Sequence, residues 1–168
     1  MKNKKLIVSI IIVIIIMIII GLLIFWPKTS GDNKEFSQEY SIKVPKSTTI
    51  VYLDDESLIQ AFSTKDKLVF IGRKSSKETQ KAVRKLLKTA EDNGIDKIYY
   101  YDTEGLAKKD EIVNELTAKL GKEGITSPTL FLIKNKKVDK IEEGLNKNIE
   151  EKYEEIMIAY IMCNTPDC

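Results

Sequence analysis

The stretch ITSPTLFLIKNKKV, residues 125–138, carries the clearest structural pattern in the chain. Within it, TLFLIK (129–134) is predicted to be the first strand of a hairpin. Asn135-Lys136 follows as a turn, and KVDKIEEG (137–144) continues as a second strand. Two strands joined by so short a turn predict an antiparallel hairpin.

A second decisive stretch, KLVFIGRKSSKET (67–79), joins a strand to a long helix. KLVFIG (67–72) is an apolar run typical of a buried strand. Ser75 with Glu78 fits a capping box at the helix start, and Asn93-Gly94 closes the helix. Between them, apolar residues recur at helical spacing: Ala82, Val83, Leu86, Leu87 and Ala90.

The remaining periodic segments complete an alternating pattern. Strands are expected at 48–53 and 97–102, and helices at 55–62, 109–120 and 148–162. The order β-α-β-α-β-α-β-β-α predicts an α/β domain with a mixed sheet flanked by helices. In that sheet we expect the strand at 67–72 to lie between those at 48–53 and 97–102.

The N-terminal stretch LIVSIIIVIIIMIIIGLLIFW (6–26) contains no charged residue. At about 1.5 Å per residue it spans about 31 Å as a helix, which matches the hydrocarbon core of a bilayer. A cleaved signal peptide is the alternative, but its apolar core is shorter and a small-residue cleavage pattern follows it. The stretch therefore predicts a single transmembrane helix.

The lysines around this stretch predict its orientation. Lys2, Lys4 and Lys5 precede it, whereas only Lys28 follows at once, so residues 1–5 are expected in the cytoplasm. Residues 27–47 lack sustained periodicity and are interpreted as a linker to an extracytoplasmic domain over 48–168. The Ile- and Lys-rich composition suggests a bacterial source, and hence a bacterial cytoplasmic membrane.

The composition excludes several classes of function. The chain has 168 residues, no histidine and a net charge of +2. A Ser-His-Asp triad, a Cys-His dyad and a histidine-ligated metal are therefore impossible. Two cysteines cannot form a four-cysteine zinc site, and the weak charge argues against nucleic-acid binding. We expect neither a metal nor a cofactor.

Three stretches together resemble the thioredoxin superfamily: KLVFIGRKSSKET, ITSPTLFLIKNKKV and the glycine at 144. In that family they correspond to the strand and helix that carry the CxxC motif, to the cis-proline segment with its hairpin, and to the glycine after the hairpin. The FIGR and SPT stretches look more like the small membrane-anchored bacteriocin transport accessory group. The resemblance covers roughly residues 48–162 and implies a thioredoxin-like fold.

The chain departs from the family at the reactive site. The positions matching the two family cysteines are Ser76 and Thr79. Disulfide exchange requires a thiolate, and serine has no comparable acidity and no histidine to deprotonate it. Ser76 and Thr79 are therefore interpreted as helix-start residues without redox chemistry.

The resemblance also implies a binding groove that could survive the loss of the thiols. Pro128 matches the cis-proline, and Ser127 occupies the place whose backbone pairs with an extended peptide in the family. Arg73 and Lys74 border the same groove and would favour an acidic ligand. The leading hypothesis is a non-enzymatic, membrane-tethered binding or accessory module with a protein or peptide partner. A subunit of a larger envelope complex is a further alternative.

The two cysteines, Cys163 and Cys168, lie in the C-terminal stretch MCNTPDC. A structural disulfide is expected, because Asn164-Thr165-Pro166 favours a turn and the envelope permits oxidation. Free or intermolecular thiols remain an alternative. A redox centre is the other, which would make the chain a thiol-disulfide oxidoreductase. A helix C-terminus disfavours a thiolate, which argues against that activity.

The predicted topology can be measured with a reporter fused after Cys168. An alkaline phosphatase fusion, which folds only outside the cytoplasm, should be active, and a cytoplasmic fluorescent reporter at the same position should not. The predicted orientation rests on the three lysines that precede the apolar stretch. An inactive phosphatase fusion together with a fluorescent cytoplasmic reporter would contradict it.

The state of the tail can be read by mass spectrometry. Alkylation without reduction, on protein isolated from its own envelope, should leave Cys163 and Cys168 unmodified because the two thiols are oxidised together. Alkylation of both residues would show a reduced tail and rule out the structural disulfide.

Overall fold

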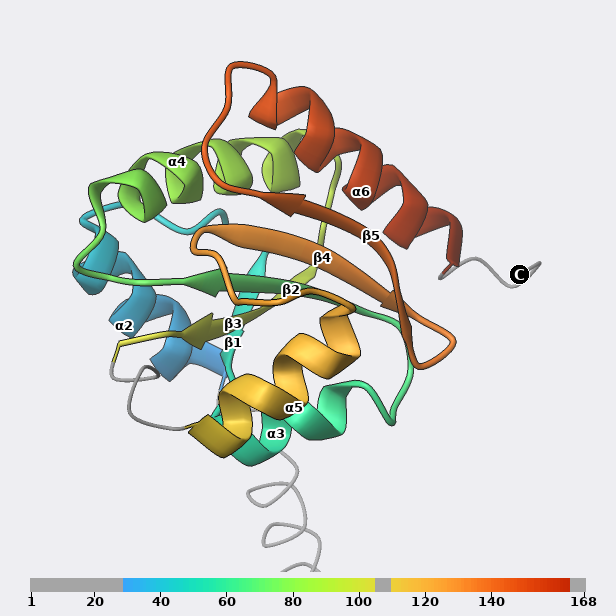
Figure 1. The fold of residues 1–168 in the computed structure, drawn as a ribbon. Coiled ribbons are helices and arrows are strands. Elements are labelled where there is room, and N and C mark those ends of the chain that lie inside the picture. Colours follow the sequence, from blue (N-terminus) through green and yellow to red (C-terminus); the bar gives the residue numbers. More distant parts are fainter. Residues whose placement is uncertain (1–28, 105–109, 164–168) are drawn as a thin grey trace, which may run out of the picture. The chain divides into compact units, whose positions relative to one another are not determined.

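The computed structural model describes residues 29–104 and 110–163 (Figure 1). The expected transmembrane helix over 6–26 lies outside the described residues. Within the described ranges, no helix is both long enough and apolar enough to cross a membrane. The described residues from Gly31 onward belong to one compact unit.

Five strands form one sheet in the order β1-β3-β2-β4-β5. β1 and β2 each pair in parallel with β3, whereas β4 pairs antiparallel with both β2 and β5. The sheet is therefore mixed, as predicted. The elements are α2 (Thr29–Tyr40), β1 (Thr49–Tyr52), α3 (Asp55–Ala61), β2 (Lys67–Gly72), α4 (Lys77–Asp92), β3 (Lys97–Asp102), α5 (Asp110–Leu120), β4 (Thr129–Lys134), β5 (Lys137–Glu143) and α6 (Ile149–Cys163).

The predicted hairpin is confirmed. β4 and β5 are joined by Asn135 and Lys136, whose φ angles of 51° and 66° are both positive. Positive φ at both central residues is the geometry of a type I′ turn, whose twist matches that of the flanking strands. Asn at the first position tolerates this conformation better than most residues do.

The predicted order of the parallel strands is wrong. β3, not β2, lies between the other two, with Tyr99 opposite Val51 on one side and Val69 on the other. Burial explains this arrangement. In β3, Tyr100 and Tyr101 point to opposite faces and both are buried, whereas the four-residue β1 is only partly buried. The short, half-exposed strand therefore takes the edge.

Helices cover both faces of the sheet (Figure 1). Residues of α2, α4 and α6 share one hydrophobic core with Tyr100, and residues of α3 and α5 share a second core with Tyr101. β2 is buried on both faces of the sheet, which explains why its sequence is continuously apolar. The architecture is a three-layer α/β domain.

The interpretation of residues 27–47 as a linker is wrong, because α2 is part of the first core. Phe36 and Tyr40 are buried, and the Phe36 ring meets Tyr100 edge-on with centroids 5.0 Å apart. The Tyr40 and Tyr100 hydroxyls are 2.6 Å apart. The domain therefore includes α2 and does not begin at residue 48. Its two aromatic anchors, one turn apart, are too few to produce a helical periodicity.

α2 also satisfies the outer edge of β1. The Asn33 side chain accepts a hydrogen bond from the Ile50 amide at 2.7 Å and donates to the Thr48 carbonyl at 2.9 Å. The Tyr52 amide donates to the Asp32 carboxylate at 3.4 Å. Side chains of one helix therefore stand in for a neighbouring strand along this edge.

The inclusion of α2 in the core can be tested by Phe36→Ala. Removing a fully buried phenylalanine should lower the free energy of unfolding by about 3–5 kcal/mol. Chemical denaturation of the full chain in detergent, followed by circular dichroism, measures this. Lys34→Ala, at an exposed position of the same helix, is the control and should change stability by less than about 0.5 kcal/mol. Equal, small effects would mean that α2 does not stabilise the domain.

Candidate functional site

The candidate site lies where β2 ends and α4 begins. Ser76 is the N-cap of α4: its backbone is extended, with φ −83° and ψ 125°, and its hydroxyl accepts a hydrogen bond from the Thr79 amide at 3.3 Å. The predicted capping box of Ser75 and Glu78 is therefore wrong. Ser75 lies one residue too early, and its hydroxyl donates to Glu104 at 3.3 Å instead.

Thr79 is the most buried polar residue of the site, with no exposed surface. Its hydroxyl accepts a hydrogen bond from the Arg73 amide at 3.3 Å and lies 3.1 Å from the Ser127 hydroxyl. Its methyl group packs against Gly72, where a Cβ added to the glycine would lie only 2.8 Å from that methyl carbon. Thr79 thus connects the end of β2, the loop after it and the segment before β4.

The segment before β4 has the predicted backbone. The peptide bond between Ser127 and Pro128 is cis. Pro128 is buried, Ser127 is half-buried, and the Pro128 carbonyl accepts a hydrogen bond from the Gly144 amide at 2.7 Å. The ladder between β2 and β4 begins at Thr129, so the backbone of Ser127 lies just outside it.

The four predicted groove residues do not all come together. Ser127 and Pro128 lie beside Thr79, as expected. The Lys74 ammonium instead lies 3.6 Å from the Asp102 carboxylate and 3.9 Å from that of Glu39. Lys74 is therefore associated with β3 and α2 rather than with Ser127. Arg73 is exposed and is tied to the site only through its backbone amide.

Glu39, the ion-pair partner of Lys74, is also hydrogen-bonded to a tyrosine, and two further tyrosine hydroxyls pair with each other. The Tyr52 hydroxyl donates to Glu39 at 2.6 Å, and burial together with this bond raises the pKa of Tyr52. Burial likewise raises the pKa of Tyr40 and of Tyr100. All three hydroxyls are consequently neutral at physiological pH and act as hydrogen-bonding groups, not as bases.

The hydroxyls of Ser76 and Thr79 are both engaged in hydrogen bonds within the domain. Ser76 is occupied by capping, Thr79 by two hydrogen bonds, and the sequence has no cysteine before residue 163. Across the described part of the chain, no three His, Cys, Asp or Glu side chains are grouped so as to hold a metal ion. Cys163 ends α6, but Cys168 lies outside the described residues, so their pairing stays a prediction.

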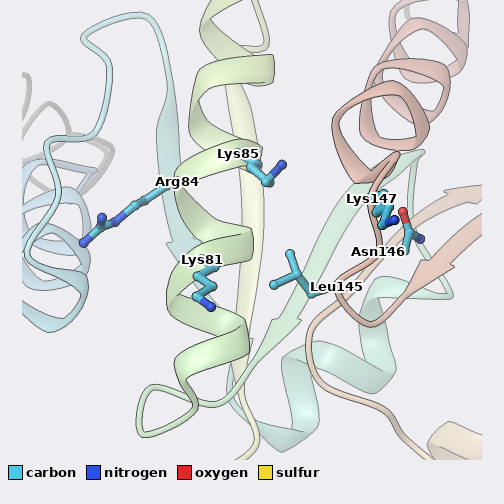
Figure 2. Close-up of a pocket in the computed structure, with 6 residues that line it drawn as sticks. All are labelled: Lys81, Arg84, Lys85, Leu145, Asn146 and Lys147. Carbon is cyan, nitrogen blue, oxygen red and sulfur yellow. The ribbon is translucent and has the colours of Figure 1, made fainter.

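Sequence reasoning missed a basic cavity on the flank of α4. A cavity of about 680 Å³ lies between α4 and the loop that follows β5 (Figure 2). Its lining residues are Lys81, Arg84, Lys85, Leu145, Asn146 and Lys147. The signal was present in the sequence, since Lys81 and Lys85 are spaced by one helical turn, but nothing there indicated that Leu145 would lie opposite them.

The fold is similar to that of solved thioredoxin-like structures. One is described as an oxidoreductase with a thioredoxin fold, at 13% identity and a TM-score of 0.50, covering 67% of this chain and 93% of that chain. Another is a poplar thioredoxin h mutant, also at 13% identity and a TM-score of 0.50, covering 75% of this chain and 92% of that chain. No protein-family model matches the sequence, and no curated protein matches it. The similarity establishes a thioredoxin-like fold and leaves activity open.

The structural role of Ser76 can be measured by Ser76→Ala. Losing the N-cap should lower the free energy of unfolding by about 1 kcal/mol, because the Thr79 amide loses its partner. Ser75→Ala is the matched control, since Ser75 is exposed and is not the cap, and should change stability by less than about 0.5 kcal/mol. Denaturation curves that rank the two variants in the opposite order would contradict the assignment of the cap.

Proposed function

We propose that the chain is a redox-inactive binding module with a thioredoxin-like fold, tethered to the outer face of a bacterial cytoplasmic membrane. The observation that carries the proposal is the pair of hydroxyl residues at the start of α4. Ser76 caps the helix, and Thr79 bonds to the loop and to Ser127. Both positions serve the structure, and neither supplies a thiolate for disulfide exchange.

The proposed binding element is the backbone of Ser127. Ser127 precedes the β4 ladder, lies beside Thr79 and is half-buried. An extended peptide could pair with it as an added strand, through main-chain hydrogen bonds. The partner on this proposal is a protein or peptide, as expected of an accessory protein of the bacteriocin transport type.

The tether is supported by the sequence alone. Residues 6–26 are apolar and uncharged over a length that matches a bilayer, and three lysines precede them. The proposed location places the domain in an oxidising compartment, where a protein without reactive thiols can bind partners without exchanging disulfides with them.

The absence of redox activity can be tested by insulin reduction with the full chain in detergent. The chain should not accelerate reduction above the rate given by dithiothreitol alone, because no activated thiolate is available. Thioredoxin is the positive control. Catalysed reduction that disappears in Cys163→Ser would overturn the proposal in favour of an oxidoreductase that uses Cys163 and Cys168.

Binding at Ser127 can be tested by photo-cross-linking in native membranes. A photoreactive amino acid at Thr126, which is exposed and adjacent to Ser127, should give one discrete adduct with a protein or peptide. The same amino acid at Lys65, before the start of β2, is the control and should not give that adduct. The same adduct from both positions, or none from Thr126, would contradict the proposed binding surface.

A further inference from the structure

A row of basic side chains runs along one side of α4. Lys81, Lys85 and Lys88 recur at spacings of four and three residues, which places them on one face of the helix. Lys77 extends the row by one turn toward the helix start, so it covers about 16 Å of helix at 1.5 Å per residue. The chain as a whole has a net charge of only +2, so the positive charge of this row is a local feature of α4.

The row borders a cavity with an apolar floor. Leu145 is half-buried, packs against the first core and lies between Lys81 and Lys85 on one side and Lys147 on the other (Figure 2). Arg84 points away from Leu145, toward the other side of α4 (Figure 2). The charged part of the cavity is therefore formed by Lys81, Lys85 and Lys147.

The loop that carries Leu145 and Lys147 is held in place by its own hydrogen bonds. The Gly144 amide donates to the Pro128 carbonyl at 2.7 Å. The side-chain carbonyl oxygen of Asn146 accepts from the Asn148 amide at 2.9 Å, while its side-chain amide donates to Glu142 at 2.5 Å. These bonds fix both ends of the loop, so the cavity exists before a ligand arrives.

The positive charge of the cavity is only partly balanced from within the domain. Glu150 lies 3.1 Å from Lys85 and 3.9 Å from Lys88. The described residues contain no ion pair that involves Lys81 or Lys147. Lys81 and Lys147 thus line the cavity with no carboxylate of the described residues within ion-pair distance of either ammonium group.

We propose that this cavity binds an acidic peptide segment of a protein partner, with an apolar side chain over Leu145 and carboxylates against Lys81 and Lys147. The basic row is as long as about five residues of extended peptide. The apolar floor favours a peptide over a phosphate polymer, because only the peptide can displace water from Leu145 with an apolar group. This surface differs from the one at Ser127, and the inference does not depend on it.

The test uses the full chain, labelled with ¹⁵N, in zwitterionic micelles at low salt. The probe is the capped peptide acetyl-Asp-Glu-Leu-Glu-Asp-amide, and the readout is the shift of backbone amide signals with peptide concentration. The amides of Lys81, Leu145 and Lys147 should shift. Replacing the probe's leucine by serine should weaken binding about fivefold, through lost apolar contact. Neutral amides in place of its four carboxylates should abolish binding.

The double variant Lys81→Glu and Lys147→Glu should weaken binding of the probe by about tenfold, because two attractions become repulsions. Lys65→Glu, Lys137→Glu and their combination are charge-matched controls at exposed positions outside the cavity, and should stay within about twofold. Circular dichroism verifies that each variant is folded.

Three results would overturn the proposal. The first is the absence of shifts around the cavity with the acidic probe. The second is equal binding of the neutral probe or equal loss in the control variants, which would mean that the charges at Lys81 and Lys147 do not select the ligand. The third is binding of tripolyphosphate at least as tight as that of the peptide, which would identify a general anion site.

Discussion

The hydroxyl of Tyr100 imposes the constraint on which much of this domain depends. Tyr100 lies on β3, between β1 and β2, with no exposed surface, and a buried hydroxyl without a partner costs about 1–3 kcal/mol. Tyr40 provides that partner at 2.6 Å, which fixes the end of α2 against the sheet. Glu39, the neighbour of Tyr40, is then positioned between Tyr52 and Lys74, and Lys74 belongs to the loop that leads into α4.

The same requirement for a hydrogen-bond partner applies at the start of α4. Thr79 is fully buried among Gly72, the Arg73 amide and Ser127, so its hydroxyl must be paired within the protein. Through these hydrogen bonds, Thr79 connects the loop after β2 with the segment before β4.

The sequence was sufficient where local pattern and tertiary environment agree. The apolar runs of β2 and β4 and the Asn135-Lys136 turn follow from signals within a few residues, whereas the cis bond before Pro128 was expected from the resemblance to the thioredoxin superfamily. The sequence does not predict the features that depend on contacts between residues far apart along the chain. α2 is held by contacts with β1 and β3, the order of the parallel strands depends on what covers each face, and Lys74 turns toward Glu39, which is far away along the chain.

Asn33 has a consequence for the association of this protein with copies of itself. A free sheet edge exposes a row of amides and carbonyls on which a foreign strand can grow. Along β1 those groups are already bonded to the amide of Asn33, which presents one acceptor and one donor much as a peptide unit does. The opposite boundary of the sheet is β5, whose pairing with β4 shifts register between Leu132 and Ile133. One edge of the sheet is thus covered by a helix and the other is irregular, which disfavours the pairing of a strand from a second copy with either edge.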